Sequence, residues 1–189
     1  YGGVGLSFLD LTILLEETGA AMLPGPFFAT VVLGGMTIME AGNEFQKQEM
    51  LPNIAGGQSI VTLALLEPTA SWRPEGVEAT AAVDGEGFVL NGVKLFVPYA
   101  HVSDRIIVAA RTGDSPRDIT LYLVDRDADG IEHTLLKTIA SDRQSELILN
   151  DVAVPGLAVL GEVDKGWDII EKVLQWGAVG KCSEMVGGA

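Results

Sequence analysis

Apolar residues change their spacing twice along the chain. Up to residue 57 they recur at intervals of three and four, as in Leu6, Leu9 and Ile13, which is the period of one helix face. From residue 59 to residue 155 they form short runs separated by glycine, proline, asparagine and aspartate, as strands and turns do. Helical spacing returns at residue 166. The pattern predicts helices, then a β-domain, then a helix.

The first 57 residues are expected to form an all-helical block. Ser7 and Asp10 have the form of a capping box, and Gly19 is placed to end that helix. Asn43 and Gln46 form a second N-cap pair. The first helix is expected between Ser7 and Gly19, and others at residues 27–33 and 36–41. A fourth is expected from residue 44, strongly helical to residue 50, with Phe45 and Met50 as apolar contacts, a kink at Leu51-Pro52 and an end at Gly56-Gly57.

The middle of the chain is expected to form seven or eight short strands. Residues 81–98 read as a meander with one turn at residues 84–87 and a tight hairpin turn at Asn91-Gly92, because Asn-Gly readily adopts positive φ. The other strands are expected at residues 60–66, 105–111, 119–124, from 130 onward and at 146–149, the last followed by NDVAVP at 150–155, with a long loop at 67–76. This spacing is typical of a small antiparallel barrel or sandwich.

One long amphipathic helix is expected from Gly166, with Cys182 as a core residue on its apolar face. The fold class is therefore α+β: an N-terminal helical block, a middle domain that is an antiparallel barrel or sandwich, and one long C-terminal helix. The expected domains are residues 1–57, 58–160 and 161–189. The chain opens without methionine, so we expect it to be a piece of a longer protein.

Composition narrows the possible functions. Twenty-six acidic residues against 12 basic ones give a net charge of −14, which disfavours binding to nucleic acid phosphates. A single cysteine excludes an internal disulfide and a cysteine zinc site, and His101 and His133 are expected in surface loops, so no metal is expected. No apolar run has the length of a membrane span, and the first residues lack the basic region of a signal peptide. We expect a cytoplasmic protein.

Several short motifs, weak singly, occur in a specific order. They resemble the acyl-CoA dehydrogenase family: FQKQEMLP at 45–52, LALLEP at 63–68, NGVK at 91–94, DVAVP at 151–155, and GE and KGW at 161–167. The resemblance covers nearly the whole chain. It implies a helical N-terminal domain, an antiparallel β-barrel middle domain and a C-terminal four-helix domain. On this resemblance the first domain is partial here, the second is complete, and the third is a truncated bundle of which only the first long helix is present.

The resemblance also implies a chemistry. Members of this family bind FAD between the middle and C-terminal domains and oxidise an acyl-CoA thioester at Cα–Cβ. A carboxylate removes the α-proton while flavin N5 accepts the β-hydride. An electron-transfer flavoprotein usually reoxidises the flavin, and members form homo- or hetero-oligomers, either tetramers or dimers.

Two segments resemble the family's flavin contacts but depart from its usual residues. Leu66 replaces the usual threonine and Pro98 replaces a hydroxyl residue, so neither offers a side-chain hydrogen bond, and Phe96 keeps an apolar ring. Trp72 either covers the ligand or packs in the barrel wall, whereas Arg73 and Lys94 are expected at the surface. The expected cofactor contacts are Leu65, Leu66, Thr69, Ala70, Ser71, Phe96, Val97 and Pro98. For Thr69 two roles stay open: its hydroxyl contacts the flavin, or the residue only shapes the loop.

No catalytic residue is expected in this piece. In most of the family the base is a glutamate in the C-terminal domain, which would lie beyond Ala189. In one branch it aligns with Gly177, and a nearby arginine aligns with Ala178, so the chain does not follow that branch. Glu171 and Glu184 have the spacing of solvated carboxylates. An alternative is a non-catalytic or half-site subunit of a heteromeric complex, and a third is an interaction module without flavin.

Overall fold

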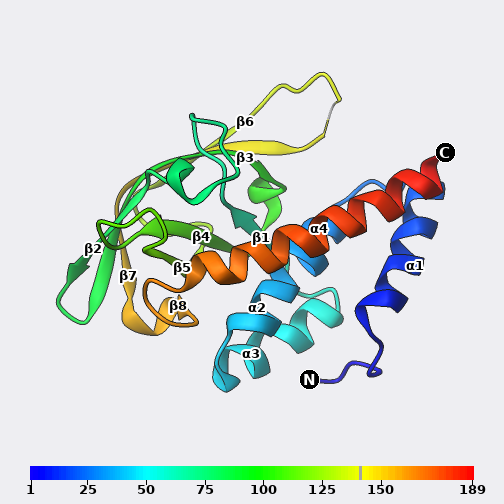
Figure 1. Cartoon of the computed structure of the whole chain (residues 1–189), viewed down its shortest axis with the longest axis horizontal. Helices are drawn as coiled ribbons and strands as arrows, with labels where there is room; N and C mark the ends of the chain where they lie inside the picture. Colours follow the sequence, from blue (N-terminus) through cyan, green and yellow to red (C-terminus); the bar gives the residue numbers. More distant parts are fainter. Residues whose placement is uncertain (141) are drawn as a thin grey trace.

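The computed structural model describes residues 1–140 and 142–189. A helical layer formed by the N-terminal part lies beside a twisted sheet, and the long C-terminal helix α4 runs across both (Figure 1). The far end of α4 lies alongside α1, so segments from the two ends of the chain are neighbours (Figure 1). The helices are α1 (Phe8–Ala20), the π-helix η1 (Ala29–Gly35), α2 (Met36–Ala41), α3 (Glu44–Ala55) and α4 (Gly166–Gly188).

The strands form a mostly antiparallel sheet in the order β6-β7-β3-β2-β4-β5-β8. β1 pairs in parallel with β4, and β2 meets β4 at Thr80 and Arg111. The strands are β1 (Val61–Ala64), β2 (Thr80–Asp84), β3 (Gly87–Pro98), β4 (Arg105–Arg111), β5 (Ile119–Asp125), β6 (Ile131–Leu135), β7 (Gln144–Pro155) and β8 (Val159–Leu160). The predicted order of helices, sheet and long helix is confirmed.

The predicted hairpin turn at Asn91-Gly92 is wrong. β3 continues through this dipeptide, and its pairing with β7 shifts register between Leu90 and Gly92. Asn91 Nδ2 donates a hydrogen bond to Asp151 Oδ1 on β7 at 2.9 Å. A Cβ on Gly92 would lie 2.6 Å from that of Ala79. The positive φ of 145° at Gly92 therefore serves an irregularity within one strand rather than a reversal.

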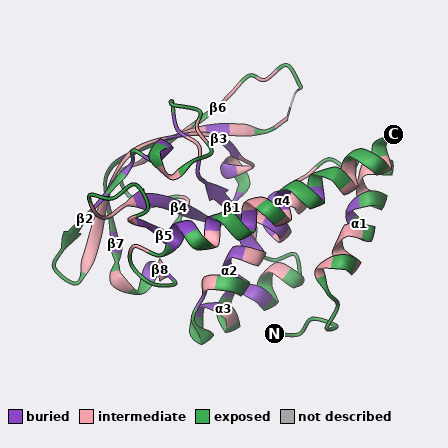
Figure 2. Ribbon diagram, in the orientation of Figure 1, coloured by how far each residue is buried: buried purple, intermediate pink, exposed green. Residues whose placement is uncertain are grey.

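Two hydrophobic cores lie on opposite faces of the sheet. One joins the sheet to the helices and includes Ile38, Met50, Ile107 and Trp167. The other lies between β3, β4, β5 and β7 and includes Leu90, Val108, Tyr122 and Leu147. Buried residues accordingly gather along the central strands and the inward-facing turns of the helices (Figure 2). Phe45, predicted to be an apolar contact of α3, is instead 71% exposed.

Glycines predicted to end helices lie inside them. Residues 27–41 are one continuous helical run through η1 and α2, although Gly34 and Gly35 were expected to interrupt it. A Cβ on Gly34 would lie 2.7 Å from the carbonyl oxygen of Val61, so this glycine permits close packing of η1 on β1. Gly19 likewise lies within α1, against the backbone of Glu184. The capping boxes at Ser7 and Asn43 are confirmed.

Three single-residue predictions differ from the structure. Cys182 is exposed rather than in the core. His133 lies in β6 with its Nε2 atom 2.7 Å from the carbonyl oxygen of Arg126, and His101 is half-buried in a short 3₁₀ turn, so neither is a surface-loop residue. Within the two described ranges, no helix is long and apolar enough to cross a membrane.

Candidate functional site

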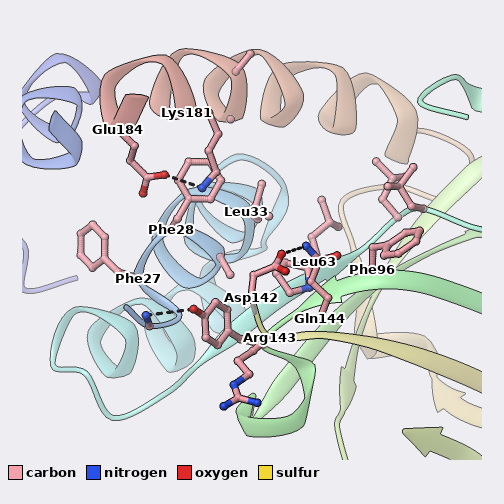
Figure 3. A pocket seen from close by; sticks show the side chains of 18 of the residues that line it. Phe27, Phe28, Leu33, Leu63, Phe96, Asp142, Arg143, Gln144, Lys181 and Glu184 are labelled. Atoms are coloured by element: carbon pink, nitrogen blue, oxygen red, sulfur yellow. Dashed lines mark hydrogen bonds and ion pairs between the residues drawn. The ribbon is translucent and has the colours of Figure 1, made fainter. Parts of the chain in front are cut away.

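A cavity of about 710 Å³ lies where the N-terminal helices, β3 and α4 meet. Its helical side comes from α1, residues 27–33 and α4, and its sheet side from residues 63–66 and 95–99. Figure 3 shows Phe28 and Leu33 on one side of it and Phe96 on the other. The lining is mainly apolar, so the cavity suits a large, flat or hydrophobic ligand.

The sheet side presents an aromatic ring through a strained backbone. Phe96 has φ of 54°, a left-handed conformation that is unusual for a bulky residue. It sits where the pairing of β3 with β7 shifts between Lys94 and Val97. The bulge interrupts the regular alternation of side chains between the two faces of the sheet, and Phe96 is left 47% exposed at the cavity. Strain of this kind occurs preferentially at ligand sites.

The helical side offers space and one paired charge. Gly177 and Ala178 of α4 line the cavity, and a Cβ on Gly177 would meet only Leu33, at 3.7 Å. One turn further on, Lys181 Nζ lies 3.9 Å from the centre of the Phe28 ring and donates to Glu184 at 2.6 Å (Figure 3). The ammonium group is therefore held by a carboxylate and an aromatic face together.

The structure brings only part of the predicted cofactor set to the cavity. Leu65, Leu66, Phe96 and Pro98 line it, as does Trp72, which is 58% exposed. The remaining four, which are Thr69, Ala70, Ser71 and Val97, are absent from the lining.

Those four residues have other surroundings. The Thr69 hydroxyl donates to the carbonyl of Gly76 at 3.2 Å, and the Ser71 hydroxyl accepts from the N–H of Arg73 at 3.3 Å. Both hydroxyls thus shape the loop that carries Trp72. Val97 is 1% exposed and points into the second core.

Lys94 contradicts its predicted surface position. It is fully buried, and its ammonium group lies 2.5 Å from Glu67 Oε1. Burial lowers the pKa of Lys94 from its usual value, while the charge of Glu67 opposes that effect. The NGVK motif gave no sign of this pair, because the partner carboxylate lies 27 residues earlier.

The Glu67 carboxylate is fully hydrogen-bonded. Besides Lys94, it accepts from the backbone N–H of Glu78 at 2.8 Å and of Ala79 at 3.0 and 3.1 Å. Glu67 directly follows the cavity residue Leu66, and Lys94 directly precedes Leu95, which also lines the cavity. The pair therefore lies behind the cavity wall.

Sequence reasoning missed two other groups at the cavity. The Tyr99 hydroxyl accepts from the backbone N–H of Gly25 at 3.2 Å, joining the sheet to the N-terminal helices. Asp142, also in the lining, accepts from Thr138 and Gln144, and these bonds lower the pKa of its carboxyl group. The contact of Tyr99 with Gly25 joins residues 74 positions apart, so local spacing carries no signal for it. The partners of Asp142 are local, but nothing in their spacing places that carboxylate at the cavity.

The two glutamates of α4 are both engaged. Glu184 pairs with Lys181, and Glu171 accepts from Arg117 and from Trp167 Nε1, the latter at 2.9 Å. These partners lower the pKa of Glu171, with Arg117 the largest cause. Among the described residues, no group of three or more His, Cys, Asp or Glu side chains is arranged to hold a metal ion.

Two family profiles match the chain. Residues 1–58 match "Acyl-CoA dehydrogenase, N-terminal domain", and residues 62–152 match "Acyl-CoA dehydrogenase, middle domain". Among curated proteins, acyl-CoA dehydrogenase FadE26 of Mycobacterium tuberculosis is 32% identical over 92% of this chain and 45% of its own length. The chain thus spans about half the length of the curated relatives that it matches.

Solved structures give the same picture. The Tcur3481-Tcur3483 steroid ACAD superposes with a TM-score of 0.90 at 32% identity, over 100% of this chain and 49% of that one. The ChsE4-ChsE5 complex from Mycobacterium tuberculosis superposes with a TM-score of 0.85 at 32% identity, over 93% of this chain and 46% of that one. Each of the two titles joins two designations, and the second calls its pair a complex.

Proposed function

Because the chain belongs to the acyl-CoA dehydrogenase family, we propose that the full-length protein is an FAD-dependent acyl-CoA dehydrogenase. It would oxidise the Cα–Cβ bond of an acyl-CoA thioester. The observation that carries the proposal is the apolar cavity between sheet and helices, with the ring of Phe96 held in it by a left-handed backbone.

The residues around the cavity fit a flavin. A tricyclic ring needs an apolar, flat-walled space, and Leu65, Leu66, Phe96 and Pro98 supply one. Because Pro98 has no N–H and Leu66 no hydroxyl, polar contacts from this wall would be made by backbone groups of Leu65 and Leu66 and of the loop at Thr69, Ala70 and Ser71. Val97 would contribute its backbone alone, since its side chain lies in the core.

The chain's own residues would bind and orient the reactants. When bound, the flavin supplies a hydride acceptor. Phe96 would hold the ring plane by stacking, and Trp72 would cover the ligand and exclude water. Phe28 and Leu33 would provide apolar contacts on the opposite side. The reacting carbons would thereby be kept in a dry and oriented site.

The proton-abstracting carboxylate is proposed to lie outside this chain. Gly177 has no side chain to act as a base, although it faces the cavity. Glu184 is held by Lys181, and Glu171 by Arg117 and Trp167. Its partners lower the pKa of Glu171, which makes it a weaker base than a general base of this reaction requires, and the Glu184 carboxylate is occupied by its ion pair.

The remaining features of the proposal follow the family. The domain boundaries would be residues 1–57, 58–160 and 161–189. The partners would be an acyl-CoA substrate, an electron-transfer flavoprotein and further subunits in a homo- or hetero-oligomer. The location would be the cytoplasm.

A second candidate is a half-site or non-catalytic subunit of a heteromeric acyl-CoA dehydrogenase. Its support is the set of cavity positions that have lost polar side chains: Leu66, Pro98, Gly177 and Ala178. The paired designations of the similar structures point in the same direction. In this case a different subunit would complete the site.

The absorption spectrum of the full-length protein distinguishes the two candidates. Purified alone, the enzyme is expected to be yellow and to lose its flavin absorbance anaerobically when an acyl-CoA is added. A protein that is colourless alone but takes up flavin with a co-expressed homologue supports the half-site subunit. A protein that never binds flavin contradicts both candidates and leaves the interaction module.

A further inference from the structure

The ion pair between Glu67 and Lys94 joins two segments that line the cavity from the sheet side. We propose that this buried pair is a positioning device that sets the register of β3 at its bulge and so fixes where Phe96 meets a ligand. This inference rests on the proposed function, because it concerns the same cavity. It assigns to both residues a role that does not involve contact with the ligand.

Stability alone is a poor explanation for the pair. Both side chains are removed from water, with 0% and 1% of their surface exposed. Desolvation of two charges offsets most of their attraction, and apolar pairs of similar size are often equally stable. A buried ion pair does, however, penalise wrong pairings strongly, because a slipped strand would leave one charge without a partner.

Such a slip is a real hazard at this place. The pairing of β3 with β7 is irregular between Leu90 and Gly92 and again between Lys94 and Val97. A shift of one residue would turn every following side chain to the opposite face. Lys94 is the last residue in regular register before the second irregularity, so its attachment to Glu67 fixes the strand where the bulge begins.

The same pair holds the neighbouring parts of the wall together. The N–H of Leu95 donates to the carbonyl of Leu66 at 2.8 Å, beside the ion pair. Glu67 also closes the base of the loop that carries Trp72, through the N–H groups of Glu78 and Ala79. The Glu67 carboxylate therefore connects three parts of the wall: the segment after β1, the loop that carries Trp72 and the bulge of β3.

Three variants of the full-length protein test the role: Lys94→Met, Glu67→Gln and the double variant. Methionine is chosen because it is unbranched and apolar. Hydrogen exchange, measured without flavin, is expected to accelerate at the amides of residues 93–97 more than at β4 and β5. The dissociation constant for FAD is expected to rise by about tenfold to a hundredfold, as for a misplaced contact group.

Asp125→Asn is the matched control, because it breaks an exposed ion pair with Arg105 in the same sheet. It is expected to leave both measurements unchanged. The proposal is overturned if the variants are folded, as judged by circular dichroism, and yet exchange at residues 93–97 as the wild type does and bind FAD equally well. A uniform rise in exchange across the whole sheet would also overturn it, since that is the signature of a purely structural role.

The role of the pair can still be tested if the variants do not fold or if FAD does not bind. If none of the variants folds, the wild-type exchange rates decide: the amides of Glu78, Ala79 and Leu95 are expected to open together and slowly, and fast independent opening contradicts the proposal. If the wild type never binds FAD, the proposed function fails, and the hydrogen exchange of the variants still reports on the pair.

Discussion

Gly19 of α1 lies directly against the backbone of Glu184 in α4. A Cβ built on Gly19 would lie 2.0 Å from the carbonyl oxygen of Glu184, and one on Gly187 would lie 1.8 Å from that of Glu16. Glycine therefore sets the separation of the two helices. Since α1 and α4 both line the cavity, the same contact sets the width of its helical side.

Gly19→Ala is expected to destabilise the protein. Alanine favours a helix by about 1 kcal/mol over glycine, but the new methyl group meets main-chain atoms that cannot move aside. We expect a net loss of about 1–3 kcal/mol, typical of overpacking. Urea unfolding measures it, with Gly3→Ala as a control because a Cβ there meets nothing within 4 Å. Equal stability of the two variants would contradict the close contact.

Gly177→Ala is expected to have the opposite effect. Its Cβ would make an ordinary contact with Leu33, at 3.7 Å, so the helix propensity of alanine gives about 0.5–1 kcal/mol of added stability. At Gly180 the Cβ would lie 3.0 Å from Leu15 and 3.1 Å from Phe28, and Gly180→Ala is expected to gain nothing. Thermal unfolding of both variants measures the difference. A lower melting temperature for Gly177→Ala would contradict the free space beside Gly177.

Phe96→Gly is expected to separate ligand binding from stability. Glycine relieves the left-handed backbone, which offsets the loss of a half-exposed ring, so stability should stay within about 1 kcal/mol of the wild type. The affinity for FAD should nevertheless fall, because the stacking surface is gone. Fluorescence titration with FAD measures it. Ile139→Gly is the control, because Ile139 is fully exposed, and this variant should bind FAD normally.

The Glu171 carboxylate is expected to contribute to acid sensitivity. Arg117 and Trp167 lower its pKa below 4.5, so the folded protein binds fewer protons there than the unfolded chain. Its stabilising effect is present above about pH 4.5 and is lost as the pH falls through the folded-state pKa. Glu171→Gln should therefore lower the urea midpoint at pH 7, and its difference from the wild type should narrow as the pH falls through the folded-state pKa of Glu171. A variant as stable as the wild type at pH 7 would contradict a stabilising role for the pair of Glu171 with Arg117.

Local patterns in the sequence predicted the elements well. The helix starts at Ser7 and Asn43 follow from side-chain capping, which acts over three residues. The strand at Arg105–Arg111 was predicted with its bounds, because a buried strand is a continuous apolar run. Both signals are local, so a single sequence carries them.

Features that depend on distant neighbours were not predictable in this way. Asn91-Gly92 has the composition of a hairpin turn, but pairing with Asp151 keeps β3 continuous. Lys94 was predicted at the surface because its partner Glu67 lies 27 residues earlier, just after β1. The cavity was only partly anticipated: the resemblance gave Phe96 and Leu66, whereas Tyr99 and Lys181 reach it through contacts between elements.

A structure of the full-length protein reconstituted with FAD tests the central claim most directly. The account predicts that the isoalloxazine ring lies in the cavity against Phe96, with backbone groups of Leu65 or Leu66 in place of the usual hydroxyl contact. A ring bound elsewhere, or a cavity filled by the protein's own side chains while FAD is bound, would contradict it.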